Sequence, residues 1–222
     1  MTDAASSNPS PVANQCRRPS GWFGRLVLRN MNSRHSRVTD WGLSHITVDK
    51  RSVILDIGCG GGRTIQKFAT AAAEGKVRGI DHSPDSVTVA SKTNESAIKA
   101  GQVEIAVGSV SQLPFSADTF DLVSAVETHF FWPDLPNDVR EVLRVLKPGG
   151  TFVLIAEVYK GANTTTARLC EKHASQSGMT LLTLDGHRAL LETAGFGNVE
   201  VYSESNKGWV CCTGRKPAHS AE

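Results

Sequence analysis

Long apolar stretches and a strong net charge are both missing from this sequence. No run of apolar residues approaches the roughly 20 that a membrane-spanning helix needs. The formal net charge of the 222 residues is only +2, which argues against nucleic acid as the main partner. Residues 1–20, rich in Ser, Pro, Ala and Asn, contain no apolar core of a secretory signal. We therefore expect a cytoplasmic protein.

Cysteine is scarce and shows no metal-binding spacing. The five cysteines include no Cys-x-x-Cys pair. Adjacent Cys211 and Cys212 lie in a strand-like run and would point to opposite faces, so they are poorly placed to bind one metal ion. We expect reduced thiols rather than disulfides, and no metal site.

The remaining composition is that of an ordinary globular protein, with 40% hydrophobic and 21% charged residues. The length fits one domain with a sizeable core. We expect tails at residues 1–20, disordered, and 217–222, a helical cap at 21–48 and the main domain at 49–216. The cap interleaves apolar and arginine side chains. Such a helix can also lie on a membrane surface, which is the alternative to a cap that packs on its own domain.

From residue 52 onward, short apolar runs alternate with helical segments, which favours a parallel sheet covered by helices on both faces. The last two strands are separated by a short turn, which predicts an antiparallel hairpin. The predicted strands are 52–57, 76–80, 103–107, 120–126, 151–156, 198–202 and 209–213. The predicted helices are 62–73, 85–100, 134–146 and 184–194, and the polar segment 157–178 interrupts the alternation.

The strongest signal is the glycine-rich run at residues 53–62, in which an apolar strand leads into a turn that opens a helix. Ligands of open α/β sheets bind at the carboxyl ends of the strands, and Asp81 closes the next strand at the same edge. A dinucleotide site would have glycine where this sequence has Arg63. Asp56 would repel a diphosphate but attract a cation. These charges favour S-adenosylmethionine (SAM), which has an ammonium, a sulfonium and a ribose but no phosphate, over NAD.

Segment 55–60 resembles motif I of the class I SAM-dependent methyltransferases, in particular the group that includes the ubiquinone and menaquinone biosynthesis methyltransferases. The likeness extends from about residue 52 to residue 150. It also includes Gly79-Ile80-Asp81, Leu113-Pro114-Phe115, the run 120–123 and the run Leu143-Arg144-Val145-Leu146-Lys147-Pro148-Gly149-Gly150.

This resemblance implies an α/β fold with a doubly wound, Rossmann-like sheet of seven strands, the last antiparallel, preceded by the helical cap. It also assigns residues to SAM. Asp56 and the backbone of the turn would surround the methionine part, Asp81 would hold the ribose hydroxyls, and Glu127 would lie near the methyl group. The remaining cofactor-binding candidates are Gly58, Cys59 and Gly60 in the turn, and His82, Ser109 and Val110 beside the adenine. Many relatives have Asp where this sequence has Ser109, whose hydroxyl can still bind the adenine amino group.

The acceptor is expected to meet SAM after the fourth strand, at residues 127–134. Glu127 and His129 are the catalytic candidates, although a general base helps only if the acceptor arrives protonated. Candidates for the acceptor pocket are Phe130, Phe131, Trp132 and Tyr159, whose alternative role is packing.

The sequence thus predicts a SAM-dependent methyltransferase that acts on a small-molecule acceptor. Methyl transfer needs no diagnostic catalytic residue, so a non-catalytic SAM-binding protein is one alternative. An NAD-dependent oxidoreductase is the other, against which Arg63 and Asp56 argue.

Overall fold

The computed structural model describes residues 36–218. The predicted N-terminal tail, the first part of the predicted cap and the end of the C-terminal tail lie outside the described residues. Within the described part, no helix is long and apolar enough to cross a membrane.

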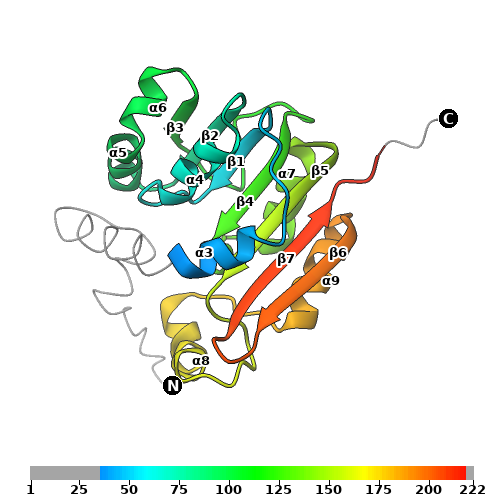
Figure 1. Cartoon of the computed structure of the whole chain (residues 1–222). Coiled ribbons are helices and arrows are strands. Elements are labelled where there is room, and N and C mark those ends of the chain that lie inside the picture. The colour runs from blue at the N-terminus through cyan, green and yellow to red at the C-terminus, as the bar shows by residue number, and fades with distance from the viewer. Residues whose placement is uncertain (1–35, 219–222) are drawn as a thin grey trace, which may run out of the picture.

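A seven-stranded sheet forms the centre of the molecule (Figure 1), with the strand order β3-β2-β1-β4-β5-β7-β6. Its strands are β1 (Val53–Ile57), β2 (Lys76–Asp81), β3 (Val103–Val107), β4 (Phe120–Val126), β5 (Leu146–Ala156), β6 (Gly197–Glu204) and β7 (Trp209–Arg215). The first five strands pair in parallel, and β7 is antiparallel to both β5 and β6. The predicted α/β class, the seven strands, the antiparallel last strand and the hairpin are confirmed.

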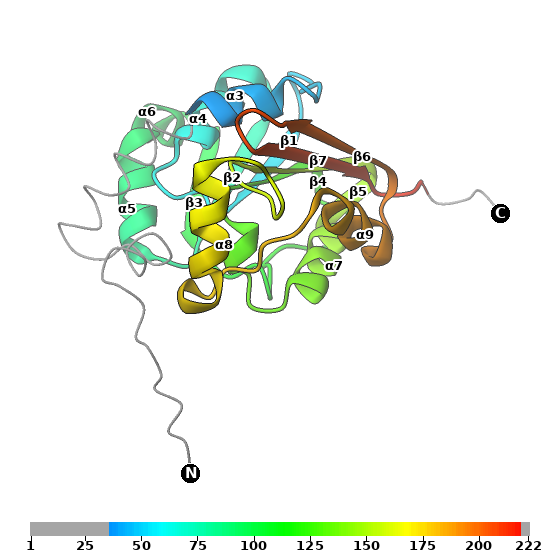
Figure 2. The same ribbon diagram turned by 90° about the horizontal axis from the view of Figure 1, so that it is seen from below.

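Helices cover both faces of the sheet (Figure 2). α3 (Ser36–Leu43), α4 (Arg63–Ala71) and α5 (Pro84–Thr93) pack on one face, and α7 (Leu135–Val145) and α9 (Leu184–Ala194) on the other. The sequence encodes this arrangement in β1, where neighbouring side chains point to opposite faces. Ile54 packs in the α4 layer and Leu55 in the α7 layer, and both are fully buried.

The chain leaves β1 toward β2 and β3, and then returns to place β4 on the other side of β1. A crevice for ligands forms at such a switch of direction, at the carboxyl ends of β1 and β4. A small 3-10 helix, η1 (His129–Phe131), follows β4 at this end. α8 (Thr165–Ser177) lies beyond the carboxyl ends of β4 and β5 (Figure 1).

Two helices differ from the prediction. The predicted helix 85–100 is interrupted after α5, and α6 (Glu95–Lys99) follows. Asn94 stands between them, and its side-chain amide donates to the carbonyl of Gly62, at 2.9 Å, in the glycine-rich turn. In the polar segment 157–178, α8 begins after Thr164, whose hydroxyl accepts a hydrogen bond from the Ala167 amide, and ends at Gly178. Local capping thus forms a helix that the weak apolar pattern did not predict.

The described part of the predicted cap contains α3, which packs closely on β5 and β7. The Cys211 thiol donates to the Gly42 carbonyl at 3.5 Å, and the rings of Trp41 and Trp209 lie 5.8 Å apart. A Cβ atom on Gly42 would lie 2.5 Å from Cδ1 of Ile155. The absence of a side chain at Gly42 therefore allows the helix to contact the sheet.

Replacement of Gly42 by alanine should therefore destabilise the protein. At an exposed position of a helix, glycine to alanine raises the free energy of unfolding by about 1 kcal/mol. At Gly42 the expected overpacking lowers it by about 1–3 kcal/mol. Urea unfolding would measure the difference, with Ser96→Ala at an exposed position of α6 as the control. A more stable Gly42→Ala protein would contradict the close contact between α3 and the sheet.

Candidate cofactor and acceptor site

The glycine-rich turn is tied to the end of β2. The amides of Gly58 and Cys59 both donate to the carbonyl of Ile80, at 2.8 and 3.0 Å. Gly58 has a φ of +70°, which favours glycine, and a Cβ atom there would lie 2.2 Å from the Thr128 hydroxyl oxygen. Glycine at position 58 therefore allows both the turn and the close approach of the segment after β4.

Asp81 joins this turn to the segment that follows β2. Its Oδ2 accepts a hydrogen bond from the Gly60 amide and its Oδ1 accepts one from the Ser83 amide, both at 2.9 Å. The residue is 6% exposed. His82, which is half exposed, lies beside it with Nδ1 3.6 Å from Asp81 Oδ1. The structure thus brings Asp81, His82 and the turn together.

Asp56 is the second carboxyl group at this edge of the sheet. It is 2% exposed, and the Ser124 hydroxyl donates to its Oδ1 at 2.6 Å. Burial raises the pKa of Asp56 to about 7, with a smaller contribution from the charge of Asp81, while the hydrogen bond from Ser124 opposes the shift. A cation bound here would favour the ionised form.

The Cys59 side chain does not suit a nucleophile. It is buried, and burial together with the charges of Asp56 and Asp81 raises the pKa of its thiol well above the usual value. The thiol therefore stays protonated, and Cys59 contributes its backbone to the turn.

The segment after β3 reaches the same edge. Val107, the last residue of β3, pairs with Asp81 in the sheet and is 54% exposed, so it presents an apolar surface beside the carboxylate. Val110 is buried in the core, and the Ser109 hydroxyl accepts a hydrogen bond from the Ser111 amide at 3.2 Å. An adenine ring would find an apolar surface and a hydroxyl group here.

Glu127 follows β4 with a φ of +57°, a backbone conformation that is uncommon for a residue with a side chain. Its amide donates to the carbonyl of Ile155 at 2.9 Å, and its Oε1 accepts a hydrogen bond from the Glu157 amide. Glu127 thus joins the carboxyl ends of β4 and β5, where a methyl acceptor would approach.

His129 lies in the interior. It is 1% exposed, and its Nε2 lies 3.2 Å from Nε2 of His187 on α9. Burial, and then the neighbouring His187, lower the pKa of His129 well below the usual value. Burial also lowers the pKa of His187. A ring that solvent does not reach is poorly placed to accept a proton from a substrate, so this position does not favour His129 as a general base.

The buried pair His129 and His187 predicts that the protein loses stability in acid. Both rings are neutral in the folded protein, whereas the unfolded chain takes up protons below a pH of about 6.5. The contribution of the two rings is therefore complete above this pH and declines as the pH falls below it, by up to about 1.4 kcal/mol per pH unit for each ring. Asp56, whose pKa is about 7 in the folded protein, contributes a slope of opposite sign below pH 7, which the wild type and the histidine variants share. Urea unfolding between pH 8 and 5.5 would measure the slope. His187→Gln should make it shallower, whereas the exposed control His173→Gln should not; equal slopes in all three proteins would contradict the assignment.

The four predicted acceptor residues do not form one pocket. Phe130 and Tyr159 share a cluster beneath α8, and Phe131 packs against it. Trp132 belongs to the main core and lies against Phe152, with ring centroids 6.5 Å apart. Trp132 also lines a separate cavity of about 590 Å³ between α7 and α9. Its indole therefore packs in a different cluster from the other three candidates.

Sequence reasoning did not single out Ser124 or Thr128. Ser124 was the one polar residue inside the otherwise apolar second half of β4, and it bonds Asp56. Thr128 shows no such signal, because its proximity to Gly58 depends on how the segment after β4 folds back over the turn.

Proteins with similar sequences indicate the family of this chain. A family described as a methyltransferase domain matches residues 55–154. The chain is 32% identical over 152 residues to the demethylmenaquinone methyltransferase of Bacillus licheniformis. Residues 55–154 form a methyltransferase domain of the class I SAM-dependent family. That match covers 65% of this chain and 64% of the Bacillus protein, so the chain spans less than two thirds of that relative's length.

Solved structures share the fold of this methyltransferase. A chain of the complex between the Haloferax volcanii Trm112 methyltransferase activator and a methyltransferase has a TM-score of 0.74 and 21% identity, covering 88% of this chain and 96% of that one. The [4+2]-cyclase SpnF has a TM-score of 0.66 and 20% identity, covering 82% and 80%. The fold thus occurs in proteins with different named activities.

SAM is the methyl donor of this family, and the edge of the sheet fits it. Two buried carboxyl groups, Asp56 and Asp81, suit a cation and a pair of ribose hydroxyls. The same two groups would repel a diphosphate, which argues against NAD.

Proposed function

We propose that this methyltransferase binds SAM at the carboxyl ends of β1, β2 and β3 and transfers its methyl group to a small-molecule acceptor. The arrangement of Asp56 and Asp81 on either side of the glycine-rich turn carries the proposal. Asp81 holds the ribose hydroxyls, and Asp56 attracts the cationic end of the cofactor. The other binding residues are Gly58, Cys59 and Gly60 at the methionine part, and His82, Ser109 and Val110 at the adenine.

The chain contributes chiefly by positioning. SAM held by these residues would supply a methyl group, activated by its sulfonium, for in-line displacement by a nucleophilic atom of the acceptor. Correct alignment of two reactants accounts for about 7–11 kcal/mol of rate acceleration in favourable cases. Glu127 lies where it can orient the acceptor, and the cluster of Phe130, Phe131 and Tyr159 beneath α8 excludes water. Trp132 supports this segment from the core.

Calorimetric titration with SAM, S-adenosylhomocysteine (SAH) and NAD tests the cofactor. We expect both sulfur compounds to bind in the micromolar range and NAD not to bind. Tight binding of NAD without a signal for SAM would overturn the proposal.

A screen of acceptors that detects released SAH tests the reaction. The relative from Bacillus licheniformis is named for demethylmenaquinone, so quinones and phenols belong in the first set. SAM binding without turnover of any acceptor would favour a non-catalytic SAM-binding protein or another reaction on this fold. The likeness to a cyclase makes that outcome worth measuring.

A further inference from the structure

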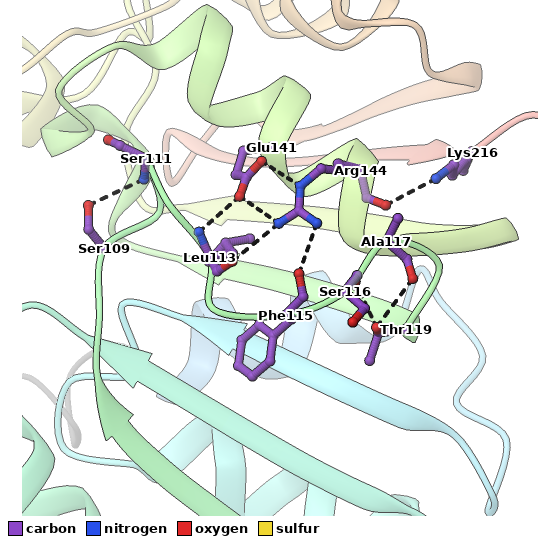
Figure 3. Close-up of polar contacts among 10 residues, drawn as sticks. All are labelled: Ser109, Ser111, Leu113, Phe115, Ser116, Ala117, Thr119, Glu141, Arg144 and Lys216. Carbon is purple, nitrogen blue, oxygen red and sulfur yellow. Dashed lines mark hydrogen bonds and ion pairs between the residues drawn. The ribbon is translucent and has the colours of Figure 1, made fainter.

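Two side chains of α7 hold the segment that joins β3 to β4. Arg144 and Glu141 form a two-point ion pair one helical turn apart, with Nε to Oε2 at 2.8 Å and Nη2 to Oε1 at 2.7 Å. Figure 3 shows that both side chains point from α7 toward the backbone of residues 113–115. Arg144 belongs to the run 143–150, for which the proposed reaction gives no role.

Arg144 and Glu141 bind the backbone groups of this segment. Arg144 donates to the carbonyl of Phe115 at 2.8 Å and to that of Leu113 at 3.2 Å, and Glu141 accepts from the Leu113 amide at 2.9 Å. These three peptide groups lie outside the strands of the sheet, and the Leu113 carbonyl also accepts a hydrogen bond from the Phe115 amide at 2.8 Å. Four of the five guanidinium N–H groups can be accounted for by these bonds and the ion pair, an arrangement that lysine cannot reproduce.

The anchored residues continue directly into the adenine-binding candidates. Leu113 follows a small turn in which the Gln112 amide donates to the Ser109 carbonyl at 3.3 Å and the Ser111 amide donates to the Ser109 hydroxyl at 3.2 Å. Leu113 and Val110 are both buried in the core. A displacement of Leu113 would therefore move the Ser109 hydroxyl and the edge of the adenine site.

Arg144 and Glu141 are both ionised at neutral pH. The hydrogen bond to Arg144 lowers the pKa of Glu141, and the bond to Glu141 raises the pKa of Arg144. Lys216 also donates to the Arg144 carbonyl, at 3.2 Å, and so helps to hold the end of α7. The anchor is thus built from charged donors and acceptors, which form the stronger hydrogen bonds.

From these contacts we infer that Arg144 and Glu141 are positioning residues for cofactor recognition, which set the Ser109 turn at the adenine amino group. The inference rests on the proposed SAM site. It assigns no contact between the pair and the cofactor, because both residues act through the backbone of Leu113.

The test measures the Kd of SAH for each protein with and without the additional change Ser109→Ala. In Arg144→Lys, the Kd of SAH should rise about tenfold. The ratio of the two Kd values, with Ser109→Ala over without it, should fall toward one, because the displaced Ser109 hydroxyl no longer contributes to binding of the adenine. Glu141→Gln keeps an acceptor for the Leu113 amide. The rise in the Kd of SAH and the fall in the ratio should therefore both be smaller than in Arg144→Lys.

Arg140→Lys is the matched control, since Arg140 lies on the same helix and donates only to Asn137 among the hydrogen bonds found in the described residues. It should keep the wild-type Kd values. A raised Kd with an unchanged ratio in the Arg144 and Glu141 variants would indicate a general loss of structure and overturn the inference. Wild-type Kd values in these variants would also overturn it while leaving the SAM site intact. If the wild-type protein bound no SAH, both the inference and the proposed function would fall.

Discussion

Asp81→Ala should raise the Kd for SAM by at least about 100-fold. A hydrogen bond to a charged group contributes about 1.5–3 kcal/mol, and a ribose offers two hydroxyls to this carboxylate. The same change leaves the amides of Gly60 and Ser83 without their present acceptor, so the turn loses its order as well. Calorimetry with SAH and SAM would measure the effect, and circular dichroism would show that the fold remains.

Two further variants separate charge from structure. Asp81→Asn keeps one oxygen for the backbone amides but removes the charge, so its Kd should lie between those of the wild type and Asp81→Ala. Glu95→Ala, which removes an exposed carboxylate on α6, should leave the Kd unchanged. Wild-type affinity in Asp81→Ala would mean that the ribose is held elsewhere.

The affinity for SAM should also depend on pH through Asp56. Its pKa is about 7 in the protein without ligand, and the bound cation favours the ionised carboxylate. Below pH 7 a growing fraction of Asp56 must lose a proton before SAM binds well, so affinity falls as the pH falls and reaches a plateau above about pH 8. The expected loss between pH 8 and 5.5 is roughly 30-fold, since each pH unit below the pKa reduces the ionised fraction about tenfold.

Asp56→Asn provides the comparison for this prediction. It should bind SAM more weakly at pH 8 and show little of the pH dependence, and titrations of the wild type near pH 6.5 in buffers of different ionisation enthalpy should reveal proton release. The titration of SAM itself contributes equally to both proteins and cancels in their difference. Identical pH profiles in wild type and Asp56→Asn would contradict the assignment of the titrating group to Asp56.

Sequence patterns predicted strands and helices best where the burial of side chains follows a regular pattern along the element. β1 is apolar on both faces because helices cover both, so its run of Ile54 and Leu55 predicted a central strand correctly. The helix predicted at residues 85–100 was interrupted because the Asn94 amide turns inward to the Gly62 carbonyl, a contact across 32 positions of the chain. α8 escaped prediction because its capping groups, rather than an apolar face, define its ends.

For the candidate site, the sequence alone determined the glycine-rich turn, Asp56 and Asp81, because these features lie next to strand ends and parallel strand ends meet at one edge of a sheet. Only the tertiary structure decided the surroundings of His129, Trp132 and Arg144. His129 is buried against a histidine 58 positions away, and Trp132 packs in a different cluster from Phe130, two residues before it. The orientation of a side chain after a strand depends on the elements that pack around it, and those contacts join segments whose separation along the chain leaves no local pattern.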